Sequence, residues 1–343
     1  MIEFGSDSHK CDTQYWGERT IHTFFHATRY YTSGRMALIV IAQQEEWKRL
    51  WVPSYFCHEI INAWKTHIDI CLYDDYPLEE NDAQIVRALP YQAGDALLRM
   101  NYFGLREKRT NDYIPVPVIE DHSHALISEW ALHSDADWCI ASLRKSLPLA
   151  FGGILWSPKG NKLPSAPKRD SEIEQLAIER YQAMDMKAQY LRNGYGNKDA
   201  FRAKYIATEE GLDHLTDIFA IDSESEQILK RLNILKWNDQ KLENWKLACK
   251  LLDRFKIIGR NTASSPFSII IAMKNKEERD NFKSFLIQHA IYPAILWNIP
   301  DNVPHERCKD FGERMLSIHC DARYTELDIQ QMCKIINQYD TNH

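Results

Sequence analysis

Short apolar segments of strand length alternate with stretches of helix length over the first two thirds of the chain. Strands separated by helices favour a mostly parallel sheet that helices cover on both faces, because each parallel connection needs a crossover. The sequence therefore predicts an α/β fold. The predicted strands are 50–53, 68–73, 96–100, 116–121, 138–142 and 152–156, the last as a hairpin partner of 138–142, and the predicted helices are 35–44 and 57–64.

A smaller α+β unit is expected after the sheet domain. Residues 158–167 are polar and rich in proline, which predicts a surface loop, and 171–191 and 223–255 have the composition of long helices, the second continuous or broken. In the closing helix, Thr325 and Asp328 resemble a capping box. We place the domain boundary near residue 225. The elements expected beyond it are strands 268–273 and 316–318 and helices 276–288 and 325–338.

The composition excludes several classes of protein. The 343 residues carry a formal net charge of −6, which provides no basic field for nucleic acid or for an acidic membrane surface. No apolar run reaches membrane-spanning length, and the segment from Met1 to Phe4 lacks the features of an export signal. The eight cysteines form no Cys-x-x-Cys pair, so we expect reduced core thiols in a cytoplasmic protein and no metal site.

The first segment that suggests chemistry ends the predicted strand 116–121. An apolar run delivers Asp121 to the carboxyl end of a strand, where open α/β sheets bind ligands. A carboxylate in this position can keep a pyridine nitrogen protonated, which makes the ring an electron sink. A capping or salt-bridged aspartate is the alternative interpretation of this segment.

The second segment contains Lys145, which follows the predicted strand 138–142. A lysine directly after a buried strand is placed for desolvation, which lowers its pKa and frees the amine for Schiff-base chemistry. Ser142 and Arg144 can donate hydrogen bonds to a phosphate, and the pair Gly152-Gly153 permits a close backbone approach. The alternative is an Arg-Lys pair in a surface loop.

The third segment is the turn Ser33-Gly34, which precedes the predicted helix 35–44. The N-terminus of a helix binds phosphate through its free N–H groups and its dipole. Ser33 as a plain N-cap is the alternative here. In chain order, the three segments supply a phosphate-binding turn, an acid for a ring nitrogen and a reactive lysine.

Taken together, these motifs resemble those of the fold-type-I enzymes that use pyridoxal 5'-phosphate (PLP), specifically the DegT/DnrJ/StrS group of nucleotide-sugar aminotransferases. The resemblance covers most of the chain, with gaps between 158 and 225. The segments that carry it are 33–38, 52–57, 101–104, 120–125, Ser142 with Lys145, Gly152 and Gly153, and, in the C-terminal third, 291–297 and 316–329.

The resemblance implies a fold-type-I PLP-transferase with a mostly parallel central sheet, a large PLP-binding α/β domain over 1–225 and a small C-terminal α+β domain over 226–343. It implies that Lys145 forms a Schiff base with PLP and transfers the substrate proton. The cofactor-binding residues that it implies are Asp121 at the ring nitrogen, Ser123 on a ring face, His124 near the phenolic oxygen, and Ser33, Gly34, Arg35 and Ser142 at the phosphate. We expect Phe56 to stack on the ring, with Tyr55 and His58 as alternatives.

The activity implied by the resemblance is transfer of an amino group, from a donor such as glutamate, to a keto-sugar nucleotide or a similar carbonyl acceptor, by a homodimer. One feature of the group is missing, because the stretch 215–226 lacks the Asn-containing segment that reaches the partner subunit's phosphate. This loss motivates the alternative of a non-catalytic or regulatory PLP-fold protein that binds a metabolite. A third interpretation is an α/β protein without PLP. A sugar dehydratase is disfavoured, because those relatives replace the lysine with histidine.

Overall fold

Seven strands form the central sheet in the order β2-β8-β7-β6-β5-β3-β4 in the computed structural model, which describes residues 3–10, 13–260 and 265–339. The five strands from β3 to β7 run parallel, whereas β8 is antiparallel to both β7 and β2. The predicted α/β class and the predicted hairpin are therefore confirmed. The strands are β2 (Thr28–Tyr31), β3 (Arg49–Pro53), β4 (Asp69–Tyr73), β5 (Asp95–Met100), β6 (Val118–Asp121), β7 (Trp138–Ser142) and β8 (Gly153–Trp156).

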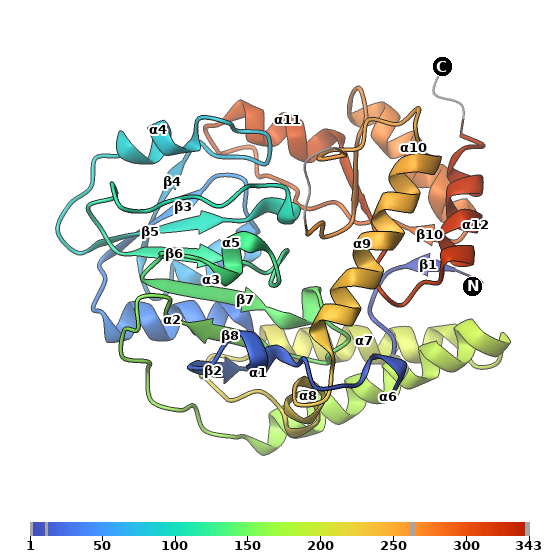
Figure 1. Cartoon of the computed structure of the whole chain (residues 1–343), viewed down its shortest axis with the longest axis horizontal. Helices are drawn as coiled ribbons and strands as arrows, with labels where there is room; N and C mark the ends of the chain where they lie inside the picture. The colour runs from blue at the N-terminus through green and yellow to red at the C-terminus, as the bar shows by residue number, and fades with distance from the viewer. Residues whose placement is uncertain (1–2, 11–12, 261–264, 340–343) are drawn as a thin grey trace.

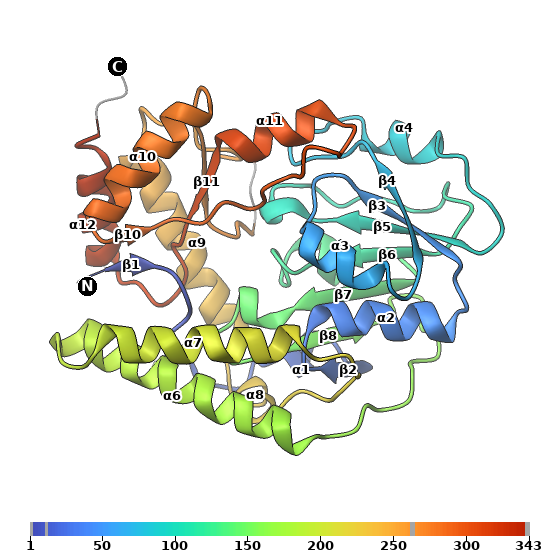
Figure 2. The ribbon, with the colours of Figure 1, turned by 180° about the vertical axis from the view of Figure 1, so that it is seen from behind.

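Apolar side chains cover both faces of the sheet. Ile140 and Leu155 pack on one face with α2 (Gly34–Gln44) and α3 (His58–Trp64), which lie in front of the strands in Figure 2. Cys139 and Ile154 point to the other face and pack with Trp237 of α9 (Ile234–Leu251). Short helices complete the sheet domain, namely α1 (Ile21–Phe24), α4 (Asp82–Arg87) and α5 (Glu129–Leu132), with 3-10 turns at Thr13–Tyr15, Tyr102–Gly104 and Leu143–Lys145.

The C-terminal unit is built on a two-stranded antiparallel ladder of β9 (Ile269–Ala272) and β11 (Met315–Ile318). The helices α9, α10 (Lys276–Gln288) and α12 (Glu326–Ile336) pack around it. A capping box begins α12, with Thr325 as the N-cap, as expected. The N-terminal strand β1 (Phe4–Gly5) pairs in parallel with β10 (Ile291–Tyr292), so the N-terminus lies beside this unit in Figure 1.

Two of the longer helices were not predicted. One is α7 (Lys198–Asp213), which packs against α6 (Ser171–Asn193). The helical stretch expected over 223–255 as continuous or broken is broken into α8 (Ser223–Leu229) and α9, because Asn233 caps a new N-terminus. The helix α11 (Glu306–Arg314) was also not predicted. Figures 1 and 2 show α6 and α7 side by side below the sheet and the C-terminal unit.

The seven cysteines of the described residues are free, as expected. Five are buried, but Cys57 and Cys71 are only partly buried, so the prediction of core thiols is wrong for these two. Cys11, Met1 and Ile2 lie outside the described residues. None of the helices in the described ranges combines the length and the apolar character needed to cross a membrane. The division into two domains at residue 225 stays a prediction.

Candidate active site

Two adjoining cavities meet at Lys145. The inner cavity has a volume of about 160 Å³ and is lined by the Ser33-Gly34 turn, Phe56, Asp121 and Lys145. The outer cavity has a volume of about 370 Å³ and lies toward the N-terminal segment and the C-terminal unit. Trp297 and Arg144 line both cavities. The three segments singled out in the sequence are therefore brought together, at the carboxyl ends of β6 and β7.

Lys145 is partly buried in the 3-10 turn that follows β7. Burial lowers the pKa of its amine, and the nearby Asp121 carboxylate opposes that shift. The amine lies 5.3 Å from the centre of the Trp297 ring. A desolvated lysine retains more of its neutral, nucleophilic form, which is the form needed to attack a carbonyl group.

Asp121 is buried at the end of β6 and lines the inner cavity. Its Oδ1 accepts a hydrogen bond of 2.8 Å from the Ser123 amide. The Ser123 hydroxyl accepts one of 2.7 Å from the Ser142 amide, and the Ser146 hydroxyl donates to the Ser123 carbonyl at 2.9 Å. These bonds connect the end of β6 to the end of β7, so Asp121 and Lys145 are held on one rigid support.

A buried hydrogen-bond network fixes β6 from its opposite face. Alternation along a strand directs Glu120 and His122 away from Asp121. The Glu120 carboxylate accepts hydrogen bonds from Ser134 (2.6 Å), Asn111 (2.7 Å) and His122 (3.1 Å). Burial acts to raise the pKa of Glu120, but these bonds outweigh it and lower the pKa. Cys139 lies at the edge of this network, and the carboxylate is satisfied by hydrogen bonds.

The turn before α2 has the features of a phosphate site. Ser33 is the N-cap of α2 but makes no side-chain capping bond, and its buried Oγ has no hydrogen-bond partner among the described residues. The plain N-cap interpretation therefore does not hold. A Cβ on Gly153 would lie 2.3 Å from the backbone carbon and oxygen of Ser33, and one on Gly34 would lie 3.2 Å from the Ser142 nitrogen. Glycine lets β8, the turn and Ser142 approach one another closely.

Two basic side chains near this turn are bonded to acids. The Arg35 guanidinium pairs with Asp213 at 3.1 Å and donates to the Leu212 carbonyl at 2.5 Å. Arg144 makes two bonds, of 2.6 and 2.8 Å, to the Glu209 carboxylate. Both acids belong to α7. A phosphate in the inner cavity would therefore meet the Ser33 hydroxyl and the α2 N-terminus more directly than either guanidinium.

His124 is fully buried and lines the outer cavity. The Phe103 amide donates to its Nδ1 at 3.2 Å, which puts the hydrogen of a neutral ring on Nε2. Burial, with the charges of Lys145 and Lys241, holds the pKa of His124 well below its ordinary value. Its Nε2 has no hydrogen-bond partner among the described residues. His124 is therefore a neutral donor with an available N–H group.

Aromatic rings surround the site. Phe56 lines the inner cavity, whereas the Tyr55 hydroxyl donates to the Leu296 carbonyl and His58 bonds to the Ser54 carbonyl at 3.1 Å. Phe56 is thus better placed than the two alternatives to cover a ring in this cavity. Trp297, which the sequence did not single out, stacks on His124 at 5.4 Å and packs on Phe56 at 5.7 Å. Its position depends on the C-terminal unit folding back onto the sheet.

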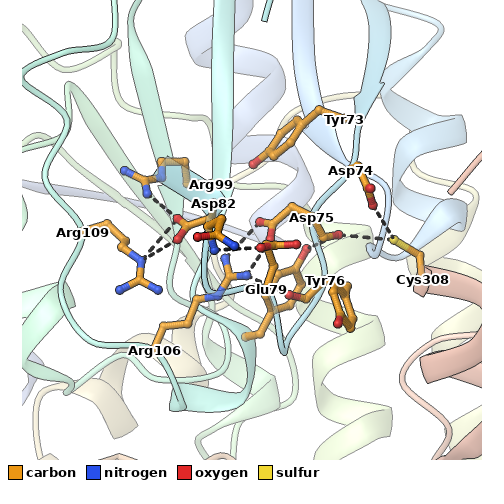
Figure 3. Close-up of polar contacts among 12 residues, drawn as sticks. Tyr73, Asp74, Asp75, Tyr76, Glu79, Asp82, Arg99, Arg106, Arg109 and Cys308 are labelled. Carbon is orange, nitrogen blue, oxygen red and sulfur yellow. Dashed lines mark hydrogen bonds and ion pairs between the residues drawn. The ribbon is translucent and has the colours of Figure 1, made fainter. Parts of the chain in front are cut away.

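A second charged network lies at the carboxyl end of β4 (Figure 3). Arg106 makes bonds of 2.5 and 2.9 Å to the Asp75 carboxylate, and both groups are buried. Arg307 of α11 donates to Asp74 and Glu79 at 2.6 Å each. The first pair stiffens the sheet edge, and the second fastens the C-terminal unit to it, next to the segment that carries Trp297.

The missing Asn-containing stretch has a different role in this chain. Residue Ala220 forms a bridge with Tyr31 of β2, and the Thr32 hydroxyl donates to the Ala220 carbonyl at 2.9 Å. Part of the stretch 215–226 is thus paired with the edge of this chain's own sheet, directly before the Ser33-Gly34 turn.

The order of the strands, the crossover helices and the site at the carboxyl edge define the fold of the fold-type-I PLP transferases. Solved structures show the same fold. A protein of Streptococcus pneumoniae described as the sugar aminotransferase Spr1654, in its PMP form, superposes with a TM-score of 0.61 at 13% identity, over 97% of this chain and 93% of that one.

Two further structures superpose over nearly the whole chain. A DegT/DnrJ/EryC1/StrS aminotransferase from Brucella abortus gives a TM-score of 0.58 at 14% identity, covering 94% of this chain and 88% of its own. A 3-amino-5-hydroxybenzoic acid synthase gives 0.59 at 14% identity and covers 98% of both chains. No protein-family model and no curated protein sequence matches the chain. At these identities the likeness establishes the fold.

Proposed function

We propose that this chain is a PLP-dependent aminotransferase that acts through Lys145. The observation that carries the proposal is that the desolvated amine of Lys145 shares one cavity with the buried Asp121 and the free N-terminus of α2. Similar structures solved in PLP and PMP forms support the choice of cofactor. When bound, PLP supplies an aldehyde for the lysine and a pyridine ring that withdraws electrons.

The residues present fit this cofactor. Ser33 Oγ and His124 Nε2 are buried polar atoms without hydrogen-bond partners among the described residues, and a bound phosphate and phenolic oxygen would supply those partners. Asp121 would face the ring nitrogen. The other groups that would hold the cofactor are Ser123 and Phe56 on the ring faces and Gly34 and Ser142 at the phosphate. Arg35 would reach the phosphate only by leaving Asp213.

Lys145 also serves as the acid and base of the reaction. Its amine lines both cavities at their junction, and burial lowers its pKa, which makes it easier for the amine to give up and take back a proton. His124 holds its Nε2 hydrogen toward the same region and stays neutral. The Trp297 ring lies 5.3 Å from the amine and limits its contact with water.

For substrates we propose glutamate, or a similar amino donor, and a keto-sugar nucleotide or a related carbonyl acceptor. The name of the similar sugar aminotransferase supports a sugar as the acceptor. A homodimer in the cytoplasm is proposed with it. A regulatory PLP-binding role is the second candidate, because the Arg35 and Arg144 guanidiniums are already paired with Asp213 and Glu209.

A visible absorption spectrum of the purified protein with added PLP tests the proposal. We expect the band of PLP attached to a lysine in the wild type and its absence in Lys145→Ala. Glutamate should bleach the band if aminotransfer occurs. A band that no amino donor bleaches would favour the regulatory role, and no band in the wild type would contradict PLP binding.

A further inference from the structure

The outer cavity contains a second charged site beside Lys145. Four cationic side chains line it, against two acidic ones. Arg323 is neutralised within the cavity by Asp321, through bonds of 2.7 and 2.8 Å. Arg180 is different, because the acids it contacts are more exposed than it is. The cationic residues are Arg144, Lys145, Arg180 and Arg323, and the acidic ones are Asp7 and Asp321.

Arg180 of α6 is fixed in place without its acidic partners. Its side chain is 7% exposed, and Nη1 donates to the Thr208 hydroxyl at 3.2 Å. The guanidinium also lies 5.2 Å from the centre of the Tyr205 ring. Neutral contacts of this kind keep the planar guanidinium of Arg180 oriented when a carboxylate partner leaves it.

The acids that face Arg180 are more exposed to solvent than its own side chain is. Asp7 lies 3.1 Å from Nη2 and is 43% exposed, and Glu209 lies 3.0 Å from Nη1 and is 38% exposed. Glu209 is shared with Arg144, which it binds with both oxygens. Asp7 is therefore the carboxylate that neutralises the remaining charge. Burial and the neighbouring Arg144 lower the pKa of Arg180, consistent with an excess of positive charge.

The segment that carries Asp7 is held by its backbone. Lys187 donates to the carbonyls of Gly5 (3.2 Å) and Asp7 (2.8 Å), Arg323 donates to the Asp7 carbonyl at 3.0 Å, and the Tyr205 hydroxyl donates to the Ser8 carbonyl at 2.5 Å. None of these bonds uses the Asp7 carboxylate. The side chain can turn toward solvent while the segment stays bound.

From this geometry we propose that Arg180 is the anion-binding residue of the outer cavity and that Asp7 is its resident counter-anion. A substrate anion, either the carboxylate of an amino donor or the phosphate of an acceptor, takes the place of the Asp7 carboxylate on Arg180. The Arg180 guanidinium keeps an anionic partner during this exchange, because one carboxylate leaves it as another anion arrives. The inference rests on the proposed function, since the substrate shares the cavity with Lys145.

Anion binding without turnover tests the inference. PLP-loaded protein is titrated calorimetrically with glutarate, a dicarboxylate with no amino group, and separately with inorganic pyrophosphate. We expect Asp7→Asn to tighten binding of at least one probe about fivefold, the size of one exposed ion pair. Arg180→Met should weaken it by at least about thirtyfold, because a buried charge-assisted contact is lost.

Two further variants serve as controls for these titrations. Asp185→Asn removes one negative charge from the same helix, where Asp185 is 46% exposed and 3.7 Å from Lys10, and should leave both affinities within twofold. Arg180→Lys keeps the charge without the planar fork. It should show about tenfold weaker binding and guards against misfolding of the Met variant.

The outcomes separate the two probes and the two proposals. Tighter glutarate binding in Asp7→Asn assigns the site to the donor carboxylate, and tighter pyrophosphate binding assigns it to the acceptor phosphate. Binding of neither probe to the wild type, or an affinity that Asp7→Asn does not increase, would overturn the inference. If the protein formed no PLP band, the proposed function would fail, yet the same titrations of the protein would still report on Arg180.

Discussion

Gly153 provides the sharpest structural test of the phosphate turn. In Gly153→Ala, the new Cβ would lie 2.3 Å from the backbone carbon and oxygen of Ser33 and 2.5 Å from the nitrogen of Gly34. Carbon atoms in proteins approach to about 3.5 Å, so the turn must move by about 1 Å. Because backbone atoms cannot rotate away as a side-chain end can, strand β8 and the turn must separate.

The magnitude follows from the groups on that turn. Overpacking of this kind costs about 1–3 kcal/mol of folding free energy. The displaced turn also loses its contacts with a bound phosphate, and each hydrogen bond to a charged group contributes about 1.5–3 kcal/mol. Losing two such bonds weakens PLP binding by at least about 3 kcal/mol, or more than about a hundredfold in the dissociation constant.

PLP titration followed by absorbance, with a thermal melt of each variant, measures both effects. Gly34→Ala is the graded comparison, because its Cβ would lie 3.2 Å from the Ser142 nitrogen and needs a smaller shift. Gly160→Ala is the control, since its Cβ would meet nothing within 4 Å and only its positive φ is strained. The reasoning is refuted if a folded Gly153→Ala binds PLP like the wild type, or if Gly160→Ala weakens PLP equally.

Three further predictions concern stability and are checked by urea denaturation. Arg106→Met leaves the buried Asp75 carboxylate without its main partner and should lower the free energy of unfolding by about 3–5 kcal/mol; a loss under 1 kcal/mol would show that the pair is dispensable. Burial raises the pKa of Asp222 to about 6 from 3.8, so the native state binds more protons between these values. The contribution of Asp222 to the free energy of unfolding, up to about 3 kcal/mol, is therefore full below pH 4 and lost by pH 6. Asp222→Asn should abolish this dependence of stability on pH, and an unchanged dependence would contradict the assignment. Thr325→Ala removes the capping box of α12 and should cost about 1 kcal/mol, and no measurable loss would mean that the helix end is held by its packing.

Six of the seven strands of the sheet, all except β2, could be predicted from the sequence because each contains a short apolar run of strand length. The predicted 138–142 coincides with β7, and 96–100 begins one residue after β5 does. The predicted helix 276–288 coincides with α10, whose end precedes a residue with positive φ, Ala290. In such segments the local pattern and the tertiary environment favour the same structure.

Other elements could not be predicted because distant residues stabilise them. Strand β1 has two residues and exists through its pairing with β10, and β2 pairs with a strand more than a hundred residues away. At the site, the motif spacing indicated Asp121, Lys145 and the Ser33-Gly34 turn. Trp297 had no such signal, because it reaches Lys145 only when the C-terminal unit packs on the sheet.

The helix α7, which no sequence motif indicated, supplies the acids that pair with the arginines of the inner cavity. Its Asp213 and Glu209 pair with Arg35 and Arg144, the two guanidiniums of the inner cavity, and Glu209 also contacts Arg180 in the outer one. Because both of these guanidiniums are paired, a phosphate at the α2 turn would accept hydrogen bonds from main-chain N–H and hydroxyl groups instead. Glu209 thereby connects the charge of one cavity to that of the other, because its carboxylate contacts both Arg144 and Arg180. If an anion binds Arg180 as proposed, we expect it to alter the charge surrounding Lys145 through this shared carboxylate of α7.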